Sequence, residues 1–410
     1  MAAGPGLPLV SAANMPKATP TYNRVLRDAW ESFCEELKGT ADLIFQDRVP
    51  DTELDRASGL RYMSRYITKA LEKTVEYADP LRPQLRVLQT PTNKTFGDNP
   101  DCTYWEATLD GSLSYRLIGN RGSVHWVRFV ATSHDGTASV VTREQLRSEW
   151  DGSYVITIGP DDNVGPNHLL TVPGGPVRLF VRQFFGDWDT EMPMTGRLEA
   201  VEDHGPPPPL TAAAVADGLA AAVDFIREDS KRWSGYPEFY RDRPNQFVAG
   251  SPTTIYSDTR KMQIDSGRWV NFCYFDLGPD DLLLIRLRPP RCWHWIIELN
   301  NFWMNSVDYR YHLSSINMKQ ASAQANGTVA VVVSDEDLGI SNWLDTAGHR
   351  SGLLIHRWVD ASEDPLPQTE VIPKAKLHEV IGDDVRRVTP QERKEQLRRR
   401  KIGVDRRFPV

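Results

Sequence analysis

Apolar residues near the N-terminus recur every three or four positions, which is the spacing of a helix that buries one face. The first such stripe consists of Val25, Leu26, Ala29, Trp30, Phe33 and Leu37. The second stripe consists of Leu54, Ala57, Leu60, Ile67, Leu71 and Val75. We therefore expect two helices, packed on each other and against a sheet, in a helical segment covering residues 21–84. Residues 1–20 are rich in Ala, Gly and Pro, a composition typical of a disordered tail.

From residue 85 the pattern changes to an alternation of apolar and polar positions, the period of a β-strand with one buried face. The alternating runs are short, and turns such as Asp110-Gly111 and Asp151-Gly152 separate them. The same pattern returns between Trp269 and Val359, after a run of prolines at 206–209 and an alanine-rich helical stretch. Short strands at regular spacing are typical of sandwiches and jelly rolls.

These patterns predict a mainly β protein, α+β overall, with two repeated jelly-roll-like β-sandwich units, an N-terminal helical segment and a linking helix. The first unit is expected at residues 85–203 and the second at 263–360. A proline-rich linker that includes the helix is expected at 204–262. The remainder, 361–410, is expected to be a polar tail with a short basic helix.

The two alternating regions also repeat each other. The matched segments, first copy before second, are 115–117 and 285–287, 125–126 and 294–295, 161–165 and 335–339, and 180–182 and 355–357. The offset between copies stays at about 170 to 175 residues, which favours an internal duplication over chance. We expect the two units to pack around a pseudo-twofold axis, with a natural cleft at the seam between them.

Composition narrows the cellular setting. The net charge of -7 argues against a nucleic-acid-binding protein, because such proteins need a basic surface. The four cysteines, Cys34, Cys102, Cys273 and Cys292, are far apart, which is typical of a reduced, cytoplasmic protein. No apolar run reaches the ~18 residues of a membrane span, and the N-terminus lacks the pattern of a secretory signal.

Several common catalytic motifs are absent from the sequence: the G-x-S-x-G elbow, the P-loop, H-E-x-x-H and the dinucleotide fingerprint. We therefore predict no cofactor and no metal. The acidic loops Asp161-Asp162-Asn163 and Asp335-Glu336-Asp337 could hold calcium, but the distal bidentate glutamate of a calcium loop is missing. Tight turns are the favoured interpretation of both loops.

The second β region contains recognisable segments. They are Leu299-Asn300-Asn301-x-Trp303, Ser306-x-Asp308-Tyr309, Asn-Trp-Leu-Asp-Thr-Ala-Gly-His at 342–349, and Arg357-Trp358. These segments resemble the bacterial family called domain of unknown function 1214. The resemblance is strong over the last third of the chain and weaker over the first β region. It implies a jelly-roll-like fold, and it brings no known reaction and no known catalytic residue.

Asp345 and His349 lie four positions apart in that stretch, close to Asn342 and Trp343. A carboxylate that orients an imidazole makes a general acid or base near neutral pH. We predict Asp345 and His349 as catalytic residues. The alternative is a structural loop, in which Asp345 accepts hydrogen bonds from backbone amides and His349 is a packing residue.

Aromatic rings beside amide and carboxylate groups suit a sugar ring or a polycyclic ligand. The predicted substrate-binding residues are Trp293, His294, Asn300, Asn301, Trp303, Asp308, Tyr311, Asn342, Trp343 and Arg357. The alternative for the tryptophans is a sandwich core. Arg286 and Arg357 have counterparts at Arg116 and Arg182 in the first copy, and this symmetry favours structural salt bridges over binding of an anionic substrate group.

Three functions follow from these patterns. The first is a cofactor-independent small-molecule enzyme, a hydrolase or lyase acting by acid–base chemistry on a hydroxylated or carbonyl-bearing metabolite in the cleft. The second is a non-catalytic protein that binds a carbohydrate or a hydrophobic metabolite. The third is a partner-docking protein that uses the basic helix at 393–401. The expected partner is a small-molecule ligand rather than a membrane or nucleic acid, and self-association into a homo-oligomer is left open.

Overall fold

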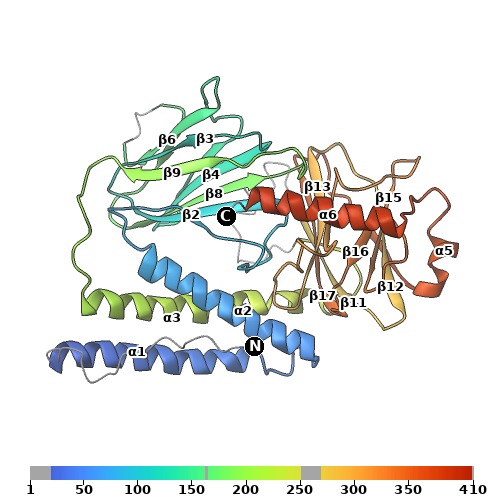
Figure 1. Cartoon of the computed structure of the whole chain (residues 1–410), viewed down its shortest axis with the longest axis horizontal. Helices are drawn as coiled ribbons and strands as arrows, with labels where there is room; N and C mark the ends of the chain where they lie inside the picture. The colour runs from blue at the N-terminus through green and yellow to red at the C-terminus, as the bar shows by residue number, and fades with distance from the viewer. Residues whose placement is uncertain (1–19, 162–164, 251–268, 409–410) are drawn as a thin grey trace, which may run out of the picture.

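The computed structural model describes residues 20–161, 165–250 and 269–408. Figure 1 shows two β units side by side, with helices α1 (Pro20–Thr40), α2 (Glu53–Leu71) and α3 (Ala212–Ser234) laid beneath them. A further long helix, α6 (Pro390–Arg407), runs across the front from one unit to the other. Within the described residues, no helix has the length and apolar character needed to cross a membrane.

The first β unit contains two sheets. Sheet A has the strand order β1-β2-β8-β4-β5, and sheet B has the order β7-β6-β3-β9. The strands are β1 (Arg86–Val87), β2 (Cys102–Asp110), β3 (Tyr115–Asn120), β4 (Trp126–Ser133), β5 (Ala138–Thr142), β6 (Ser153–Gly159), β7 (His168–Leu170), β8 (Pro176–Phe184) and β9 (Thr195–Ala200). The β6–β7 pair is parallel and the other pairs of this unit are antiparallel.

The second unit repeats this arrangement strand for strand. Sheet C has the order β10-β11-β17-β13-β14, and sheet D has the order β16-β15-β12-β18, again with one parallel pair. The strands are β10 (Val248–Ala249), β11 (Trp269–Asp276), β12 (Asp281–Leu287), β13 (His294–Asn300), β14 (Ser315–Asn317), β15 (Val329–Ser334), β16 (Trp343–Asp345), β17 (Ser351–Val359) and β18 (Gln368–Pro373). The predicted fold class of two repeated jelly-roll-like β-sandwich units is therefore confirmed.

Side-chain alternation along the strands builds one core inside each sandwich. On β4, Val127 and Phe129 point into the core between sheets A and B, whereas Arg128 points to the outer face of sheet A. On β13, Ile297 points into the core between sheets C and D, yet Glu298 on the opposite face is also fully buried. A sheet that is buried on both faces must be covered from outside, and the helices and the first unit provide that cover.

The helical layer covers part of the outer face of sheet C. Residues of α2 and α3, including Tyr66 and Ala222, share a core with Phe272 on β11 and Ile355 on β17. The predicted packing of the two N-terminal helices on each other is wrong in one respect, because α1 packs mainly against α3. Short helical elements complete this layer and the C-terminal region: η2 (Ala41–Leu43), η3 (Glu72–Glu76), η4 (Tyr236–Tyr240), η6 (Lys374–Lys376) and α5 (Leu377–Val380).

Helix α6 begins with a capping box, in which the side chains of Thr389 and Glu392 cap the first turn reciprocally. Arg393, Arg400 and Arg407 follow at intervals of one heptad and are buried. Arg400 donates hydrogen bonds to backbone carbonyls of the second unit, and Arg407 donates to a backbone carbonyl of the first unit. The basic helix expected in a polar tail is thus a clamp across both β units.

Candidate functional site at the seam between the β units

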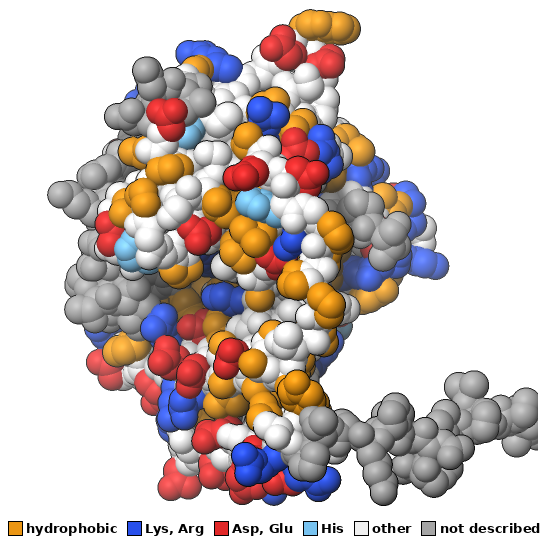
Figure 2. Space-filling model, turned by 90° about the vertical axis from the view of Figure 1, so that its left-hand side faces the viewer, with side chains coloured by type: hydrophobic (Ala, Val, Ile, Leu, Met, Phe, Trp, Pro, Cys, Tyr) orange, Lys and Arg blue, Asp and Glu red, His pale blue; other side chains and the backbone are white. Residues whose placement is uncertain are grey.

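The seam forms where the outer face of sheet A meets the outer face of sheet C. Cys102, Tyr104 and Phe184 of the first unit share a small buried cluster with Ile296 and Val359 of the second. Equivalent faces of the two copies therefore meet, as the internal repeat predicts. In Figure 2 the molecular surface is hollowed between the first β unit above and the helices below, with hydrophobic and basic side chains inside the hollow.

Two arginines, which we call the arginine pair, lie side by side on the seam face of sheet A. Arg128 on β4 and Arg182 on β8 are direct cross-strand neighbours, and both are half-buried. Within the described residues neither forms an ion pair with a carboxylate, and Nε of Arg128 is buried without a hydrogen-bond partner. Burial, and then repulsion from Arg182, lowers the pKa of Arg128. Two opposed like charges destabilise a sheet, so this arrangement favours the binding of an anion.

Neutral groups hold the guanidinium of Arg182 in place. Its Nε donates to Sγ of Cys102 at 3.2 Å, and its Nη2 donates to the hydroxyl of Tyr104 at 3.4 Å. The guanidinium carbon lies 5.4 Å from the ring centre of Tyr104 and 5.7 Å from that of Phe184. These contacts orient the arginine, and none of the described residues gives it a counter-charge.

The other end of the same face is electrically balanced. Glu106 on β2 forms an ion pair with Arg178 at 2.5 Å and a second one with the buried Arg86. The arginines at this end are therefore structural. The fold can therefore supply carboxylates for arginines on this face, yet the described residues supply none for the arginine pair.

Arg357 on β17 is the counterpart of Arg182 in the second copy and reaches the seam from the other side. Its Nη1 lies 2.7 Å from Oε1 of Glu298, and its Nη2 donates to the carbonyl of Gly97 at 3.3 Å. Oε2 of Glu298 is buried without a hydrogen-bond partner among the described residues. Burial raises the pKa of Glu298 to about 7, although Arg357 opposes the shift. The second arginine thus has a carboxylate that can gain or lose a proton near neutral pH.

Trp293 also lies at the seam, packed against the small buried cluster that joins the two units. Its ring stacks on His125 of the first unit, with ring centres 4.4 Å apart and planes 12° apart. Nη1 of Arg143 contacts Nε2 of His125, so the histidine accepts through that nitrogen and carries its proton on Nδ1 when neutral. Burial, followed by the nearby arginines, lowers the pKa of His125.

His294 follows Trp293 and joins the units internally. Its Nε2 donates to Oδ2 of Asp101 at 2.8 Å, and both side chains are buried. Oδ1 of Asp101 also accepts from the indole of Trp188 at 2.8 Å and from the amide of Asn317 at 2.9 Å. With its carboxylate fully used and no exposed ring surface, this group holds the seam together.

The predicted pairing of Asp345 with His349 is wrong. Oδ2 of Asp345 accepts from Nδ1 of His312 at 2.7 Å, while Nδ1 of His349 donates to Oδ1 of Asp55 at 3.1 Å. Asp345 ends strand β16, and its Oδ1 accepts from the backbone amide of Ala347 at 2.8 Å. A four-residue spacing brings side chains together on a helix, and this segment is a strand end followed by a turn. The geometry matches the structural alternative for this loop.

The structure also separates the predicted substrate-binding residues. Trp293, His294, Asn300 and Arg357 lie along the seam face of the second unit. The remaining six lie elsewhere: Asn301, Trp303, Asp308, Tyr311, Asn342 and Trp343.

The remaining six have visible structural roles or face solvent. Trp303 is fully buried against α2 and donates its indole N–H to the carbonyl of Asp55 at 2.8 Å. Turns are shaped by Asn301 and Asp308, whose side chains accept from backbone amides. The side chains of Asn342 and Trp343 donate to backbone carbonyls. Tyr311 is exposed.

The salt-bridge prediction for the repeated arginines is confirmed in part. Arg286 pairs with Glu370 at 3.2 Å, and Arg357 pairs with Glu298 as described above. Among the described residues Arg116 forms no ion pair with a carboxylate. Arg182 forms none either, so the symmetry argument is wrong at the position that matters most. The position on β4 that corresponds to Glu298 on β13 is occupied by Val130, so Arg182 has no carboxylate at the place where Arg357 finds one.

The acidic loops are held internally where they are described. Asp335 pairs with Lys374 at 2.6 Å, and Asp337 pairs with Arg393 on α6 at 2.9 Å. Asp162 and Asn163 of the first loop lie outside the described residues. Across the described residues, no group of three or more His, Cys, Asp or Glu side chains is arranged to hold a metal ion.

Sequence reasoning missed Arg128, Tyr104 and Glu298. Each occupies the outward position of an alternating strand, which is normally a solvent face. One signal was available: basic and aromatic residues alternate on the outward positions of β8, as Phe180, Arg182 and Phe184. Such a mixture is unusual for a fully solvated strand face.

The chain is similar to several solved protein structures. No family model matches the chain, and no curated protein matches it. A solved structure of an uncharacterised protein from Burkholderia cenocepacia is 33% identical, with a TM-score of 0.79; the match covers 87% of this chain and 100% of that chain. The VPA0106 protein from Vibrio parahaemolyticus is 12% identical, with a TM-score of 0.44; that match covers 76% of this chain and 98% of that chain.

Proposed function

The chain belongs to the same protein family as the uncharacterised Burkholderia cenocepacia protein, and we propose that it binds a small anionic molecule at the seam. One observation carries the proposal: the arginine pair, Arg128 and Arg182, lies half-buried on neighbouring strands without a carboxylate partner among the described residues. A carboxylate, sulfate or phosphate group placed between the two guanidinium groups would remove their repulsion and accept several hydrogen bonds.

The surroundings of the arginine pair favour a ligand with an apolar or aromatic body. The rings of Tyr104 and Phe184 flank Arg182. Phe180, two residues before Arg182 on the same face of β8, is partly exposed. Trp126 lies opposite Phe184 on the neighbouring strand. Rings of this kind bury the flat face of a ligand while a charged group fixes its orientation. An aromatic or polycyclic acid fits this combination better than a neutral sugar does.

The second candidate function is a cofactor-independent hydrolase or lyase at the same seam. It is favoured by Glu298, a buried carboxyl in ion-pair contact with Arg357, whose pKa burial raises to about 7. One oxygen of this carboxyl has no hydrogen-bond partner among the described residues. A carboxyl of this kind can exchange a proton near neutral pH. Asp345 and His349 stay separate predictions as catalytic residues, because they do not act as a pair in this geometry.

The resemblance of the second unit to the domain of unknown function 1214 stays a proposal as well. It rests on the residues of 299–309, 342–349 and 357–358. The seam residues Arg128 and Arg182 belong to the first unit, so the anion-binding proposal does not depend on this resemblance.

The proposal is tested with a defined probe, 1-naphthoate, and its neutral counterpart, 1-naphthalenemethanol. Binding is followed by thermal shift and by tryptophan fluorescence, since a ligand that binds the native state raises the melting temperature. We expect the acid to stabilise the wild type, and Arg128→Gln with Arg182→Gln to abolish that effect. Arg197→Gln is the matched control, because Arg197 is an exposed arginine on sheet B.

The proposal fails if organic acids, inorganic sulfate and inorganic phosphate all leave the wild type unchanged, or if they stabilise the double variant equally. Once a bound acid is known, Glu298→Gln separates the two candidate functions. A binding protein keeps its ligand unchanged over a long incubation, whereas an enzyme converts it and loses that conversion in the variant.

A further inference from the structure

Helix α1 presents an apolar row to solvent. Tyr22, Leu26 and Trp30 are spaced four residues apart, so they form one ridge along the helix. Their exposed fractions are 59%, 40% and 58%. Three large apolar residues exposed in one row form the kind of patch that marks an interaction surface.

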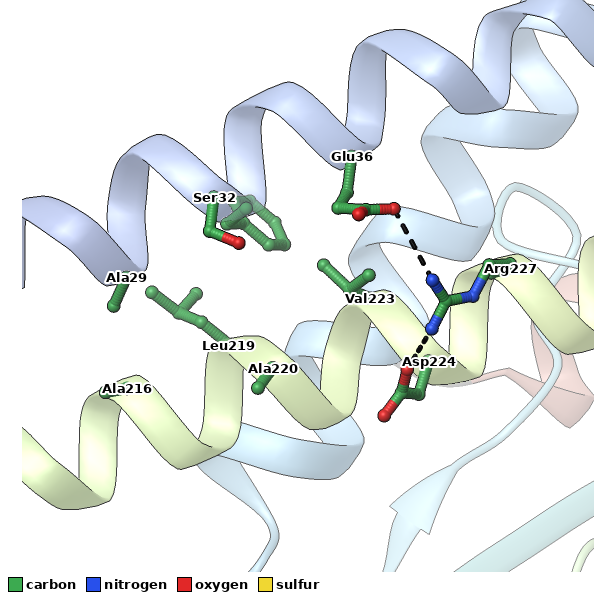
Figure 3. A pocket seen from close by; sticks show the side chains of 10 residues that line it. Ala29, Ser32, Glu36, Ala216, Leu219, Ala220, Val223, Asp224 and Arg227 are labelled. Atoms are coloured by element: carbon green, nitrogen blue, oxygen red, sulfur yellow. Dashed lines mark hydrogen bonds and ion pairs between the residues drawn. The ribbon is translucent and has the colours of Figure 1, made fainter.

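The other side of α1 is already occupied by α3. Ala29, Ser32 and Glu36 point toward α3 and line a groove of about 230 Å³ that Figure 3 shows between the two helices. In that groove Arg227 bridges Glu36 and Asp224. Figure 1 shows α1 as the outermost helix of the layer. The exposed row lies on the flank of α1 beside this groove, where α3 leaves it uncovered.

Charges on the side of α1 away from α3 are unevenly distributed along the helix. In the N-terminal half Arg24 and Arg27 outnumber Asp28. In the C-terminal half Glu31 and Glu35 outnumber Lys38, which pairs with Glu35. Arg24, Arg27 and Glu31 take part in none of the ion pairs of the described residues. A second helix of the same sequence running in the opposite direction would place its acidic half beside this basic half.

We infer that α1 docks against α1 of a second copy of this chain, in an antiparallel, twofold-symmetric pair. In a twofold-symmetric antiparallel pair, a flank of one helix lies against the same flank of the other helix. A twofold axis near residue 29 brings Arg27 of each copy opposite Glu31 of the other, and Leu26 and Trp30 pack across the axis. The inference is independent of the seam and of the function proposed for it.

A contact made by one helix from each copy is small, at the lower end of specific interfaces. The dimer is therefore expected to dissociate in the micromolar range, and its population depends on protein concentration. The full-length chain is studied by sedimentation velocity over a wide range of concentrations. We expect a concentration-dependent shift from monomer to dimer in the wild type.

Charge reversal gives the decisive arms of the experiment. Arg27→Glu alone and Glu31→Arg alone each create two like-charge contacts across the axis, so each should weaken the dimer by at least about tenfold. Mixing the two variants restores opposite charges at both contacts, and a heterodimer should form with near wild-type affinity. Trp30→Ala should also dissociate the dimer, whereas Trp150→Ala, at another highly exposed tryptophan, should not.

Circular dichroism of each variant confirms that α1 remains folded, which is expected because the substituted side chains are exposed. A wild type that is monomeric at every concentration overturns the inference. A dimer that survives both charge reversals, or a mixture that does not re-associate, overturns it as well. If deletion of residues 1–19 converts a monomeric wild type into a dimer, the chain's own N-terminal segment covers the row, and the inference fails.

Discussion

Replacement of Arg128 by methionine should stabilise the ligand-free protein while removing its affinity for anions. Arg128 is half-buried and faces Arg182 directly on the neighbouring strand, and its buried Nε has no hydrogen-bond partner in the described part of the chain. Methionine keeps most of the apolar stem of the side chain and removes the charge. Residues retained at a cost in stability are typical of binding sites.

The magnitude follows from two terms. Guanidinium groups on directly opposed residues lie roughly 6 to 8 Å apart, and at an effective dielectric constant of about 20 to 40 their repulsion is about 1 to 3 kcal/mol. An unpaired buried N–H adds about 1 kcal/mol or more. Arg128 is only half-buried, so solvent screening reduces both terms. A net stabilisation of about 1 to 2 kcal/mol, or a rise in melting temperature of about 1 to 3 °C, is expected.

The assay is urea unfolding followed by tryptophan fluorescence, with thermal unfolding in parallel. Arg182→Met should gain less than Arg128→Met, because Arg182 also contacts Cys102 and the rings of Tyr104 and Phe184. Arg197→Met, at an exposed position on sheet B, should change stability little. Added sulfate should stabilise the wild type more than Arg128→Met, since only the wild type has both cations.

A loss of more than about 1 kcal/mol in Arg128→Met would refute the reasoning, because it would mean that the guanidinium has a stabilising partner in the folded chain. Equal stabilisation of the wild type and the variant by sulfate would refute the role of the arginine pair as an anion site.

Three further predictions concern the rest of the molecule. Gly59→Ala should destabilise the folded protein by about 2 kcal/mol, because the added Cβ would lie 2.6 Å from Cζ2 of Trp303. This overpacking outweighs the better helix propensity of alanine, and a higher melting temperature of the variant would contradict the prediction. For Glu298, folding raises the pKa to about 7 from an ordinary value near 4.5, so the folded state binds more protons between these values and stability falls as pH rises through this window. Glu298→Gln should remove that slope in urea unfolding at pH 5 to 8, and an unchanged slope would show that the carboxyl does not titrate there. Arg400→Met should lower the free energy of unfolding by about 3 kcal/mol, measured by thermal unfolding, because the buried Arg400 donates hydrogen bonds to the carbonyls of Tyr309 and Ser315. Arg399→Met is the control and should leave stability unchanged, because Arg399 is exposed. Equal effects of the two substitutions would contradict the clamp role of α6.

Local periodicity was sufficient to predict the two β units, because alternation along a strand depends only on which face is buried. The repeat was visible for the same reason: each copy must present equivalent apolar positions to an equivalent core. Turn residues and the capping box of Thr389 and Glu392 depend on neighbours in sequence, so they too could be predicted.

The partners of polar side chains could not be predicted in this way. Asp345 has a histidine four residues away in sequence, yet its partner is His312, and His349 pairs with Asp55 in a helix almost three hundred residues earlier. Proximity in sequence brings charges together only on a continuous helix, and elsewhere chain topology decides which groups meet.

The sequence by itself determined the architecture of this protein: two alternating regions of matching pattern, which can bury their apolar positions only as two sandwiches of the same topology. Only the tertiary structure decided what the outward positions of those strands do. Alternation places Arg128 and Arg182 on one face of sheet A, but docking of the second unit and the helices turns that face into a half-buried seam. Burial is what makes two unpaired charges costly, and so makes them informative about function.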